Sequence, residues 1–393
     1  MSCEGFTESL WKKVAKTLPT CNPESVVFAV ETSCNLWQTV AFYLHEQGYT
    51  VLLLSPLTTH HTRPMISHDF SRTDPKDALL VASNTQHGYY DRCERFAPHS
   101  NAMHRLSITY TKLRNERAQN RARLRALVEQ IFPEFLSVLV PSTVTALYLL
   151  RKYLFPHEFC SMNIQKEAQV IAKLSRRQLG LDTLKELQRL ASRSIGIKCT
   201  AEERLAERLS LDSWIALIET LSARMDVVLK ELIKLADQLP EFEHLQSLTG
   251  ISTITWALFL AEVRDIHRYS HYKQIEKYAG LNLRQSQSGQ YVGARRISHL
   301  GNSRLRWILY TMTEETARWI PEVRIKYLTR QIKRRNHRKN IVASVPQLLK
   351  LIMALTKEQR SYEQRPEMQQ KMEQLEKQYN DMKERNTRVQ QVA

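Results

Sequence analysis

Cysteine, glycine and proline are all scarce in this chain. Its 393 residues include 6 cysteines, 10 glycines and 13 prolines. The cysteines are scattered, without a CxxC pair or a Cys/His pair at zinc spacing, so the sequence supports neither a zinc module nor a disulfide framework. We expect them to be reduced thiols. The low glycine and proline content favours a mostly helical fold.

Long hydrophobic runs are also missing. No apolar stretch approaches the roughly 20 residues that span a bilayer, and we expect no signal peptide. Hydrophobic residues still make up 42% of the chain, enough to fill the cores of two or three domains. We therefore expect a globular protein that is not bound to a membrane and that lies in the cytoplasm, associated with the nucleoid.

Acidic residues are too few to balance the basic ones. The chain carries 57 Lys and Arg against 40 Asp and Glu, a net charge of +17, and its isoelectric point is near 9.6. A positive excess of this size is typical of proteins that bind a polyphosphate. The composition thus predicts a nucleic acid as the partner.

Residues 1–100 have the apolar pattern of a partial α/β sheet. "SVVFAVETS" and "YTVLLLSP" are continuous apolar runs of strand length, typical of buried parallel strands, and a helical period lies between them over 36–46. Together they predict one right-handed βαβ unit. We also expect a helix over 6–18, a polar loop from Thr58 to Arg72, and a helix that starts at Asp74.

From about residue 101 the periodicity is helical. A long arginine-rich helix from His104, with its arginines assigned to polar positions, predicts an exposed hairpin or a coiled-coil arm. Shorter helices over 141–200 precede a long amphipathic helix that ends before Pro240. A compact block then leads to a basic helix over 323–340, which has eight basic and no acidic residues. The tail from Glu358 is either helical or disordered.

These patterns divide the chain into four parts. We expect an incomplete α/β domain at 1–100, a helical linker with the arm at 101–241, a second compact domain at 242–322, and the basic helix with a charged tail at 323–393.

Three carboxylates in the first part are candidate metal ligands. Glu31 ends the first predicted strand, at the edge where open α/β sheets collect ligand-binding groups. Asp74 and Asp77 are three apart on a helix and project from nearly the same side, and carboxylate oxygens suit Mg²⁺. A local interpretation fits as well: Asp74 as the N-cap, Pro75 as the first helical residue and Asp77 as the N3 partner of a capping box. The two interpretations are compatible.

A second set of candidates is rich in glycine, serine and arginine. Two apolar helices meet at Gly250, the outline of a helix-hairpin-helix whose turn offers backbone N–H groups to a phosphate, although an ordinary αα turn also fits. In the basic loop that follows, a serine could approach a phosphate whose charge the arginines stabilise. Serines in loops are more often plain polar residues. The loop residues concerned are Arg284, Ser286, Ser288, Arg295, Arg296, Ser298, Ser303, Arg304 and Arg306.

The order of these motifs resembles a known family. "FAVETS", "GYTVLLLSP" and "SRTDPKDALLVA" are followed by a distal segment with a G-I-x-x-x-T turn, a Y-A-G-L, an S-G and an H-L-G-N-x-x-L-R at family spacing. Over about 5–95 and 242–315 the chain is similar to the IS110/IS116/IS902 transposases. It departs from the family turn by Trp256, which stands between Thr255 and Ala257.

The resemblance implies an N-terminal RuvC-like, ribonuclease-H-type domain with an Asp-Glu-Asp-Asp site for Mg²⁺, and a C-terminal transposase domain that supplies a serine. Glu31 matches the second acid of the site, and Asp74 and Asp77 match the third and fourth. Ser288 matches the nucleophile that forms a phosphoserine link to DNA, with Ser286 as the alternative. Family members act as homo-oligomers, dimers or tetramers, on element ends and target DNA, and some use a structured guide RNA.

One family feature has no match here. The first aspartate of the family stands on an opening strand in an "IGIDVSK"-like motif, and this chain begins with the segment that follows it, "EGFTESL". We expect either that translation starts upstream of Met1 or that this copy is truncated.

The sequence therefore predicts a DNA transposase or site-specific recombinase, α/β at its N-terminus and helical after it. Ser288 would attack DNA while Glu31, Asp74 and Asp77 hold Mg²⁺, and Arg295 and Arg296 would clamp phosphates. The alternatives are a decayed copy that binds nucleic acid without cutting it, and a RuvC-type nuclease that uses metal alone. The expected nucleic-acid contacts are Gly250, Arg284, Arg295, Arg296, Arg304, Arg306, Lys333, Arg334 and Arg335.

Overall fold

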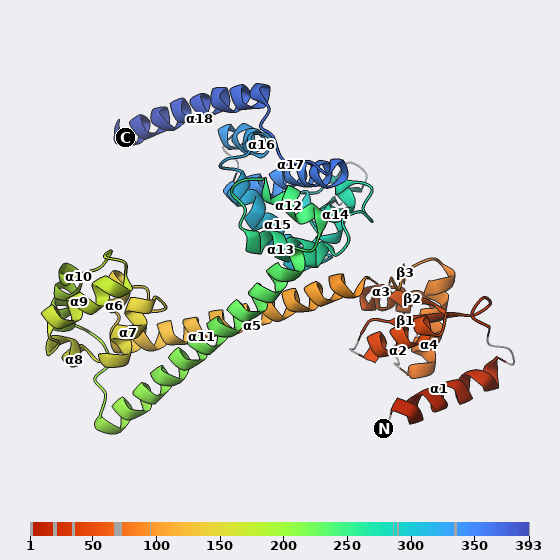
Figure 1. The fold of residues 1–393 in the computed structure, drawn as a ribbon, viewed down its shortest axis with the longest axis horizontal. Helices are drawn as coiled ribbons and strands as arrows, with labels where there is room; N and C mark the ends of the chain where they lie inside the picture. Colours follow the sequence, from red (N-terminus) through yellow and green to blue (C-terminus); the bar gives the residue numbers. More distant parts are fainter. Residues whose placement is uncertain are drawn as a thin grey trace. The chain divides into compact units, whose positions relative to one another are not determined.

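Two compact units make up the chain in the computed structural model, Met1–Ala97 and Pro98–Ala393 (Figure 1). The model is 69% helical with a small mixed sheet in the first unit, which confirms the expectation of a mostly helical chain with an α/β N-terminus. The structure describes residues 3–18, 22–33, 36–66, 73–94, 96–285, 287–288, 291–333 and 336–392.

The sheet of the first unit has three strands in the order β1-β2-β3. β1 (Val27–Glu31) runs parallel to β2 (Thr50–Leu54), and α2 (Leu36–Glu46) connects them, which confirms the predicted βαβ unit. β3 (Asp91–Arg92) pairs antiparallel with β2. The expectation that both parallel strands are buried is wrong for β1. It lies at the edge of the described sheet, so its side chains are only half-buried, whereas the central β2 is mostly buried.

Aromatic side chains hold the first helix against this sheet. α1 (Cys3–Thr17) places Trp11 against Phe28 of β1 and Tyr49, and Trp11 Nε1 donates to Tyr43 Oη of α2 at 2.8 Å. Aromatic contacts of this kind bury large areas while satisfying the indole N–H. They form the small core of the first unit.

α3 (Pro56–Ile66) occupies much of the segment expected to be a polar loop. Ser55 precedes the helix, and its Oγ accepts a hydrogen bond from Leu57 N at 3.3 Å, while Pro56 takes the first helical position. A serine cap followed by proline favours a helix start even when the following residues are polar. The loop expected from Thr58 to Arg72 is therefore wrong up to residue 66, and residues 67–72 lie outside the described part of the chain.

α4 (Asp74–Gln86) is capped one residue earlier than the sequence pattern predicts. Thr73 is the N-cap, so Asp74 and Pro75 are the first two helical residues, and Asp77 N bonds to Thr73 O at 3.0 Å. The predicted capping box between Asp74 and Asp77 is therefore wrong. Both carboxylates still lie in the first turn, where they complement the helix dipole.

The second unit is helical apart from one β-hairpin. Its helices are α5 (Pro98–Ile131), α6 (Phe135–Val138), α7 (Val144–Lys152), α8 (Pro156–Cys160), α9 (Ile164–Leu174), α10 (Leu181–Ala191), α11 (Ala201–Ala236), α12 (Pro240–Gln246), α13 (Thr253–Val263), α14 (Tyr272–Tyr278), α15 (Ser303–Thr316), α16 (Pro321–Ile332), α17 (His337–Glu358) and α18 (Pro366–Val392).

The long helices α5 and α11 pack against each other, and this helix pair is here termed the arm (Figure 1). They run antiparallel, because Met103 of α5 shares one core with Leu232 of α11, whereas Ile131 shares another core with Leu211. α11 faces α5 with residues at alternating spacings of three and four, the heptad pattern of a coiled coil. These residues are Leu211, Ile215, Ile218, Ser222, Met225, Leu229, Leu232 and Ala236.

The matching seam of α5 contains three arginines. Buried or half-buried residues along this broad side of α5 are Met103, Ser107, Tyr110, Leu113, Arg114, Arg117, Asn120, Arg121, Leu124, Val128 and Ile131, of which Asn120 is 6% exposed. The expectation that the arginines of this helix occupy only polar positions is therefore wrong for the three central ones, which are half-buried.

Helices α6 to α10 close one end of the arm. Phe132, Phe135 and Phe159 are fully buried there and contact one another. A buried carboxylate, Glu167, accepts hydrogen bonds from Tyr148 Oη at 2.8 Å and Tyr153 Oη at 3.1 Å and pairs with the Lys152 ammonium.

The C-terminal core surrounds α13, in which every residue from Trp256 to Val263 is buried. The basic helix expected over 323–340 is two helices, because α16 ends at Ile332 and α17 begins at His337, where Asn336 is the N-cap. Asn is a favoured cap that starts a new helix. Of the two alternatives for the tail from Glu358, the described structure has a helix, α18, after a non-helical segment over 359–365. Within the described ranges, no helix has the length and apolarity to cross a bilayer.

Candidate active site

The carboxyl end of β1 carries the first candidate acid. Glu31 is the last residue of the strand and is half-buried. Beyond it, Thr32 N and Thr32 Oγ1 both donate to Leu54 O, at 3.0 and 3.1 Å, so the pairing with β2 continues past the carboxylate. The backbone at Glu31 is thus held on both sides, at the sheet edge where α/β proteins bind ligands.

Asp77 lies against a basic side chain of the neighbouring helix. Arg63 Nη1 of α3 donates to Asp77 Oδ1 at 2.5 Å, and this hydrogen bond is the main cause that raises the pKa of Arg63. The charge of Glu31 raises it further. α4 is fixed on α3 by Asn84, which is 2% exposed and donates to Thr62 Oγ1 at 2.8 Å. The fold therefore pairs Asp77 with Arg63, and the charge of Glu31 acts on the same guanidinium.

Asp74 is exposed at the first position of α4, three residues before Asp77. Among the residues that the structure describes, no three His, Cys, Asp or Glu side chains form a group that could hold a metal ion. Of the predicted acidic set, Asp77 pairs with Arg63, Glu31 acts on Arg63 through its charge, and Asp74 lies one helical turn before Asp77.

Ser288 lies near the tip of a β-hairpin in the second unit. It stands opposite Tyr291, so that only Gly289 and Gln290 separate the inner strands, and those two residues, like Ser286, lie outside the described ranges. The register makes Ser288 the last described strand position before Gly289 and Gln290. The antiparallel pairs are β4 (Leu283–Arg284) with β7 (Arg296–Ile297) and β5 (Gln287–Ser288) with β6 (Tyr291–Val292).

The base of this hairpin is fixed by close backbone contacts. Ser298 is 6% exposed, and its Oγ lies 2.7 Å from Asn282 Oδ1 across the hairpin. Gly301 has φ +143°, and a Cβ there would lie 2.4 Å from Tyr278 O. Gly280 has φ +67°, and a Cβ there would lie 2.8 Å from a backbone oxygen. The Y-A-G-L and H-L-G-N motifs therefore need their glycines for close packing of two loops.

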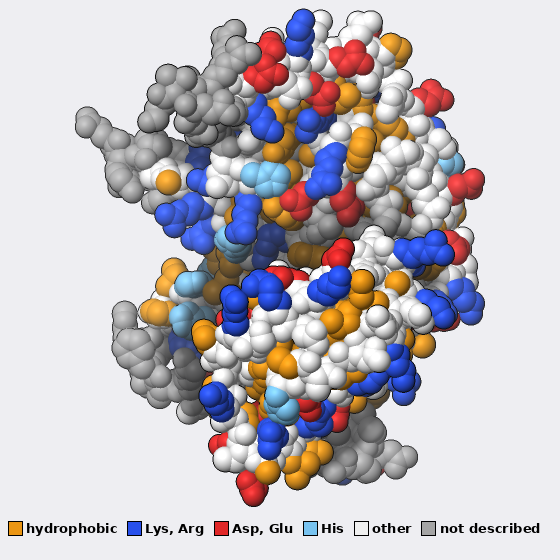
Figure 2. Space-filling view, turned by 90° about the vertical axis from the view of Figure 1, so that its left-hand side faces the viewer, with side chains coloured by type: hydrophobic (Ala, Val, Ile, Leu, Met, Phe, Trp, Pro, Cys, Tyr) orange, Lys and Arg blue, Asp and Glu red, His pale blue; other side chains and the backbone are white. Residues whose placement is uncertain are grey.

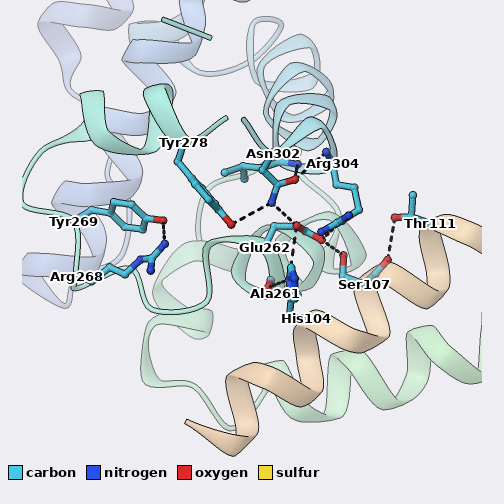
Figure 3. A network of polar contacts seen from close by, with 11 residues as sticks. His104, Ser107, Thr111, Ala261, Glu262, Arg268, Tyr269, Tyr278, Asn302 and Arg304 are labelled. Atoms are coloured by element: carbon cyan, nitrogen blue, oxygen red, sulfur yellow. Dashed lines mark hydrogen bonds and ion pairs between the residues drawn. The ribbon is translucent and has the colours of Figure 1, made fainter. Parts of the chain in front are cut away.

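A buried carboxylate ties this base to the arm (Figure 3). Glu262 of α13 is 0% exposed and accepts hydrogen bonds from Ser107 Oγ of α5 at 2.7 Å, Asn302 Nδ2 at 2.6 Å and Arg304 Nε of α15 at 2.7 Å. Asn302 Oδ1 in turn caps α15 by accepting from Arg304 N at 3.0 Å. One carboxylate thus connects three helices at the point where the hairpin returns to the core.

The electrostatics of this group favour the ionised acid. Burial alone would raise the pKa of Glu262, but the hydrogen bonds from Arg304, Asn302 and Ser107 outweigh it and hold the pKa below its usual range. His104 of α5 is half-buried here; desolvation lowers its pKa most, followed by the charge of Arg264. A neutral imidazole can donate from Nδ1 to Ala261 O, 3.2 Å away.

The predicted nucleic-acid residues fall into two groups. Arg304 and Arg306 have internal partners, since Arg304 binds Glu262 and Arg306 Nη1 donates to the carbonyls of Ala279 and His299 at 2.9 and 3.3 Å. Arg284, Arg295, Arg296 and Lys333 are exposed. Arg334 and Arg335 lie outside the described residues. Figure 2 shows that basic side chains are spread over the face it presents, with acidic ones among them.

Gly250 occupies the turn between α12 and α13 with φ +94°, a conformation that favours glycine. Trp319, 63% exposed, lies over it, 3.1 Å from where a Cβ would be. Ser252 caps α13 by accepting from Thr255 N at 3.2 Å.

Sequence reasoning missed Arg63 and Glu262. For Glu262 a signal was present, because it is the single charge in the apolar helix "TITWALFLAEV", and a lone charge in such a helix requires a buried partner. Arg63 lies in a segment expected to be a loop, and nothing local marks it as the partner of Asp77.

Comparison with protein families gives two matches at the two candidate sites. A model of the DEDD type, described as a transposase, matches residues 2–133, and so covers Glu31 and Asp77. The class of the protein is therefore that of a DNA-processing transposase. A second model, described as the transposase IS116/IS110/IS902 family, matches residues 242–328, and so covers the serine hairpin and Glu262. The chain belongs to the IS110 family of transposases. No individual curated protein matches it at a significant level.

Proposed function

We propose that this transposase cuts and rejoins DNA through the hydroxyl of Ser288. The observation that supports the proposal is the register of the hairpin, in which Ser288 pairs with Tyr291 just before the turn. The segment 283–306 around it has five arginines and no acid. A serine at the end of a hairpin strand in a positively charged segment suits attack on a DNA backbone, because the backbone is a chain of anions.

In the proposed cleavage step, Ser288 Oγ attacks the phosphorus of a phosphodiester and gives up its proton to solvent or a nearby base. A P–O bond to the serine forms, the bond to one deoxyribose oxygen breaks, and that oxygen takes up a proton and leaves as a hydroxyl. Rejoining reverses the step with a hydroxyl of another DNA end, which releases the serine. The covalent intermediate conserves the phosphodiester energy, so no external energy source is needed.

The arginines have two different roles in this proposal. The exposed Arg284, Arg295 and Arg296 bind the phosphate oxygens, where charge-assisted hydrogen bonds are strongest. Arg295 Nε already lies 2.8 Å from Gln285 Oε1 across the hairpin, which orients the guanidinium. Arg304 and Arg306 hold the base of the hairpin through the internal contacts described above. Gly250 and residues Lys333, Arg334 and Arg335 add contacts to the DNA backbone.

The acidic set of the first unit suits Mg²⁺. Carboxylate oxygens are the hard ligands that this ion prefers, and Arg63 at Asp77 and Glu31 indicates that a positive charge is favoured there. Glu31 and Asp77 would hold the ion in place of Arg63, with Asp74 from the same helical turn. When bound, the ion would neutralise charge on the phosphate oxygens of the DNA.

The proposed partners follow the family. They are the DNA of the element ends and the target, further copies of this chain in a dimer or tetramer, and a structured guide RNA. We propose that 1–100 binds the metal, that 242–322 supplies the serine, that the parts at 101–241 and 323–393 add assembly and DNA contacts, and that the protein works on the nucleoid in the cytoplasm.

A suicide DNA substrate tests the chemistry. The protein is incubated with Mg²⁺ and a nicked element-end duplex, and covalent protein–DNA adducts are measured by denaturing electrophoresis. We expect an adduct with the parent chain, no adduct with Ser288→Ala, and an adduct with Ser286→Ala, the matched control two residues away. Asp77→Asn should lower the rate of adduct formation while leaving DNA affinity unchanged.

The alternatives give other outcomes in the same assay. DNA binding without any cleavage would favour a decayed copy that only binds nucleic acid. Hydrolysis that depends on Asp77 and persists in Ser288→Ala would favour a RuvC-type nuclease that uses metal alone. Either result would overturn the role proposed for Ser288.

A further inference from the structure

The middle of the arm has an unusual seam. Near the two ends of α5, this side carries buried apolar residues such as Met103 and Ile131, which are 1% and 2% exposed. Between them, beside the buried Asn120, lie Arg114, Arg117 and Arg121, here termed the seam arginines, and all three are half-buried. The core positions of a coiled coil normally take apolar side chains because burial there stabilises the pair.

α11 offers the seam arginines no charge partner. Arg117 Nη1 donates to Ser222 Oγ at 3.3 Å, the only hydroxyl in the facing seam. This contact sets the antiparallel register, which puts Ile218 and Met225 of α11 level with the arginines on either side. Neither can accept a hydrogen bond from a guanidinium in any useful strength.

The acidic residues that neighbour these seam positions on α5 and α11 either pair with another arginine or are exposed. On α11, Glu219 forms a two-point ion pair with Arg151, at 3.0 and 2.7 Å. Asp226 and, on α5, Glu116 are exposed. Within the part of the chain that the structure describes, no ion pair to a seam arginine is found.

Arg121 carries the clearest sign of a missing partner. Its Nε is buried and has no hydrogen-bond acceptor in the described structure. Burial lowers the pKa of this guanidinium, and the charge of Arg117 lowers it further. Three like charges on one side of the helix without a paired acid are unfavourable for the fold, because half-burial removes part of their hydration and the hydrogen bond from Arg117 to Ser222 is to a neutral group.

An aromatic side chain lies beside Arg114, the first of the three seam arginines. Arg114 Cζ is 3.9 Å from the ring centroid of Trp307, and Trp307 is 42% exposed on α15. A tryptophan that stacks on arginine and still faces solvent is a common element of nucleic-acid surfaces, because bases and sugars can pack on the remaining ring area. Trp307 also lies one turn after Arg304, at the helix that anchors the serine hairpin.

We propose that the seam arginines, together with Trp307, bind the phosphate backbone of a nucleic acid laid along the arm. The three guanidiniums span seven residues, about 10 Å of helix, which matches about three phosphates along one strand. The missing counter-charge is then supplied by the ligand. This inference deepens the proposed function and rests on it only for the class of ligand. It assigns a binding surface outside both the serine hairpin and the acidic set.

Salt-dependent binding of the full chain, measured without Mg²⁺, tests the inference. The variant R114Q/R117Q/R121Q is compared with R105Q/K112Q/R125Q, which removes the same charge from exposed positions of the same helix. Each is titrated with a short duplex DNA and a duplex RNA of the same sequence at several salt concentrations. The binding constant K falls as salt rises, so the slope of log K against log salt is negative. We expect its magnitude to decrease by about 3 for the seam variant and by less than about 1 for the control.

Thermal unfolding provides the second readout. If the seam arginines are retained for binding, the seam variant should melt at the same temperature as the parent or higher, because unpaired half-buried charges are removed. Loss on DNA alone or on RNA alone identifies the source of the phosphates. Should the triple variant fail to fold, Arg121→Met, which fits an apolar seam position, is expected to lower the slope by about 1.

Two results would overturn the inference. Equal loss of slope in the seam and control variants would mean that only net charge matters. An unchanged slope together with a lower melting temperature would mean that the arginines stabilise the arm. Because no cleavage is measured, failure of the Ser288 chemistry leaves this test intact, and a normal phosphoserine adduct would not rescue it.

Discussion

At the scale of single residues, Glu262 is a buried charge whose ionised form depends on its hydrogen-bond partners. It is fully buried and holds Ser107, Asn302 and Arg304 at once. Removing one partner of a buried ion pair leaves the others unsatisfied, so Glu262→Ala is expected to lower the free energy of unfolding by about 3–5 kcal/mol. Urea unfolding followed by tryptophan fluorescence measures this.

Glu219→Ala is the matched control for that change. Glu219 also pairs with an arginine, Arg151, but the two side chains are 49% and 44% exposed. An exposed pair contributes less than about 1 kcal/mol, so the control should change the unfolding free energy by no more than that. Equal effects of the two substitutions would mean that the Glu262 network is not a stabilising centre.

His104 gives this unit a dependence on pH. Burial and the charges of Arg264 and Arg304 lower its pKa, while Glu262 opposes them. The folded state therefore keeps the imidazole neutral where the unfolded chain, with a pKa near 6.5, binds a proton. The stability is fully present above about pH 6.5 and is lost as pH falls. Unfolding free energies at pH 8 and pH 5.5 should differ less in His104→Gln than in the parent, and an unchanged difference would contradict this.

The sequence found some of these residues and missed others for a physical reason. Glu31 and Asp77 could be proposed as site residues because a strand end and a helix start are local patterns. Arg63, which joins them, was missed because it pairs across two helices, and its own helix had been taken for a loop. A side chain whose role depends on a partner fourteen residues away leaves no mark in a short window of sequence.

At the scale of elements, the serine hairpin depends on its base. Gly301→Ala would place a Cβ 2.4 Å from Tyr278 O and 2.9 Å from Gly280 N, so the backbone must shift. We expect a loss of stability of at least about 1–3 kcal/mol from strain, with a lower rate of DNA cleavage because the hairpin moves. Thermal unfolding and the adduct assay measure the two effects.

Gly88→Ala separates backbone strain from the clash. Gly88 also has a positive φ, +79°, but a Cβ there meets nothing within 4 Å. It should lower stability by about 1 kcal/mol and leave DNA cleavage unchanged. If Gly301→Ala were no more harmful than this control, the close approach of the two loops would not matter for the hairpin.

The elements themselves were predictable to different degrees. The βαβ unit and the long helices followed from periodicity, which is a property of the buried face alone. The helix α3 was missed because its residues are mostly polar, and its start depends on the cap at Ser55. The seam of α5 was misjudged because arginine was assumed to mark a solvent face, whereas Arg114, Arg117 and Arg121 are half-buried.

At the scale of the whole molecule, the basic side chains have two different kinds of surroundings. Some basic side chains hold the fold together, as Arg304 does at Glu262 and Arg306 does at the hairpin base. Others are exposed on the hairpin or half-buried in the arm without an acid. The net charge of +17 predicted a polyanionic partner, and membership of a transposase family implies a DNA substrate. Only the contacts in the structure distinguish the basic residues that stabilise the fold from those that are available for binding.

The proposed chemistry uses a serine of the second unit and carboxylates of the first, and a pair of substitutions tests whether they serve the same step. Ser288→Ala and Asp77→Asn lie in different units, so their effects on folding should be independent. If both groups serve one transition state, each single variant should slow strand cleavage severely, and the double variant should be no slower than the slower single, because residues that act together are strongly non-additive. Single-turnover cleavage rates at saturating DNA measure this, with Ser286→Ala in place of Ser288→Ala as the control that leaves the Asp77→Asn rate unchanged. A double variant whose loss equals the product of the two single losses would mean that serine and carboxylate act in separate steps.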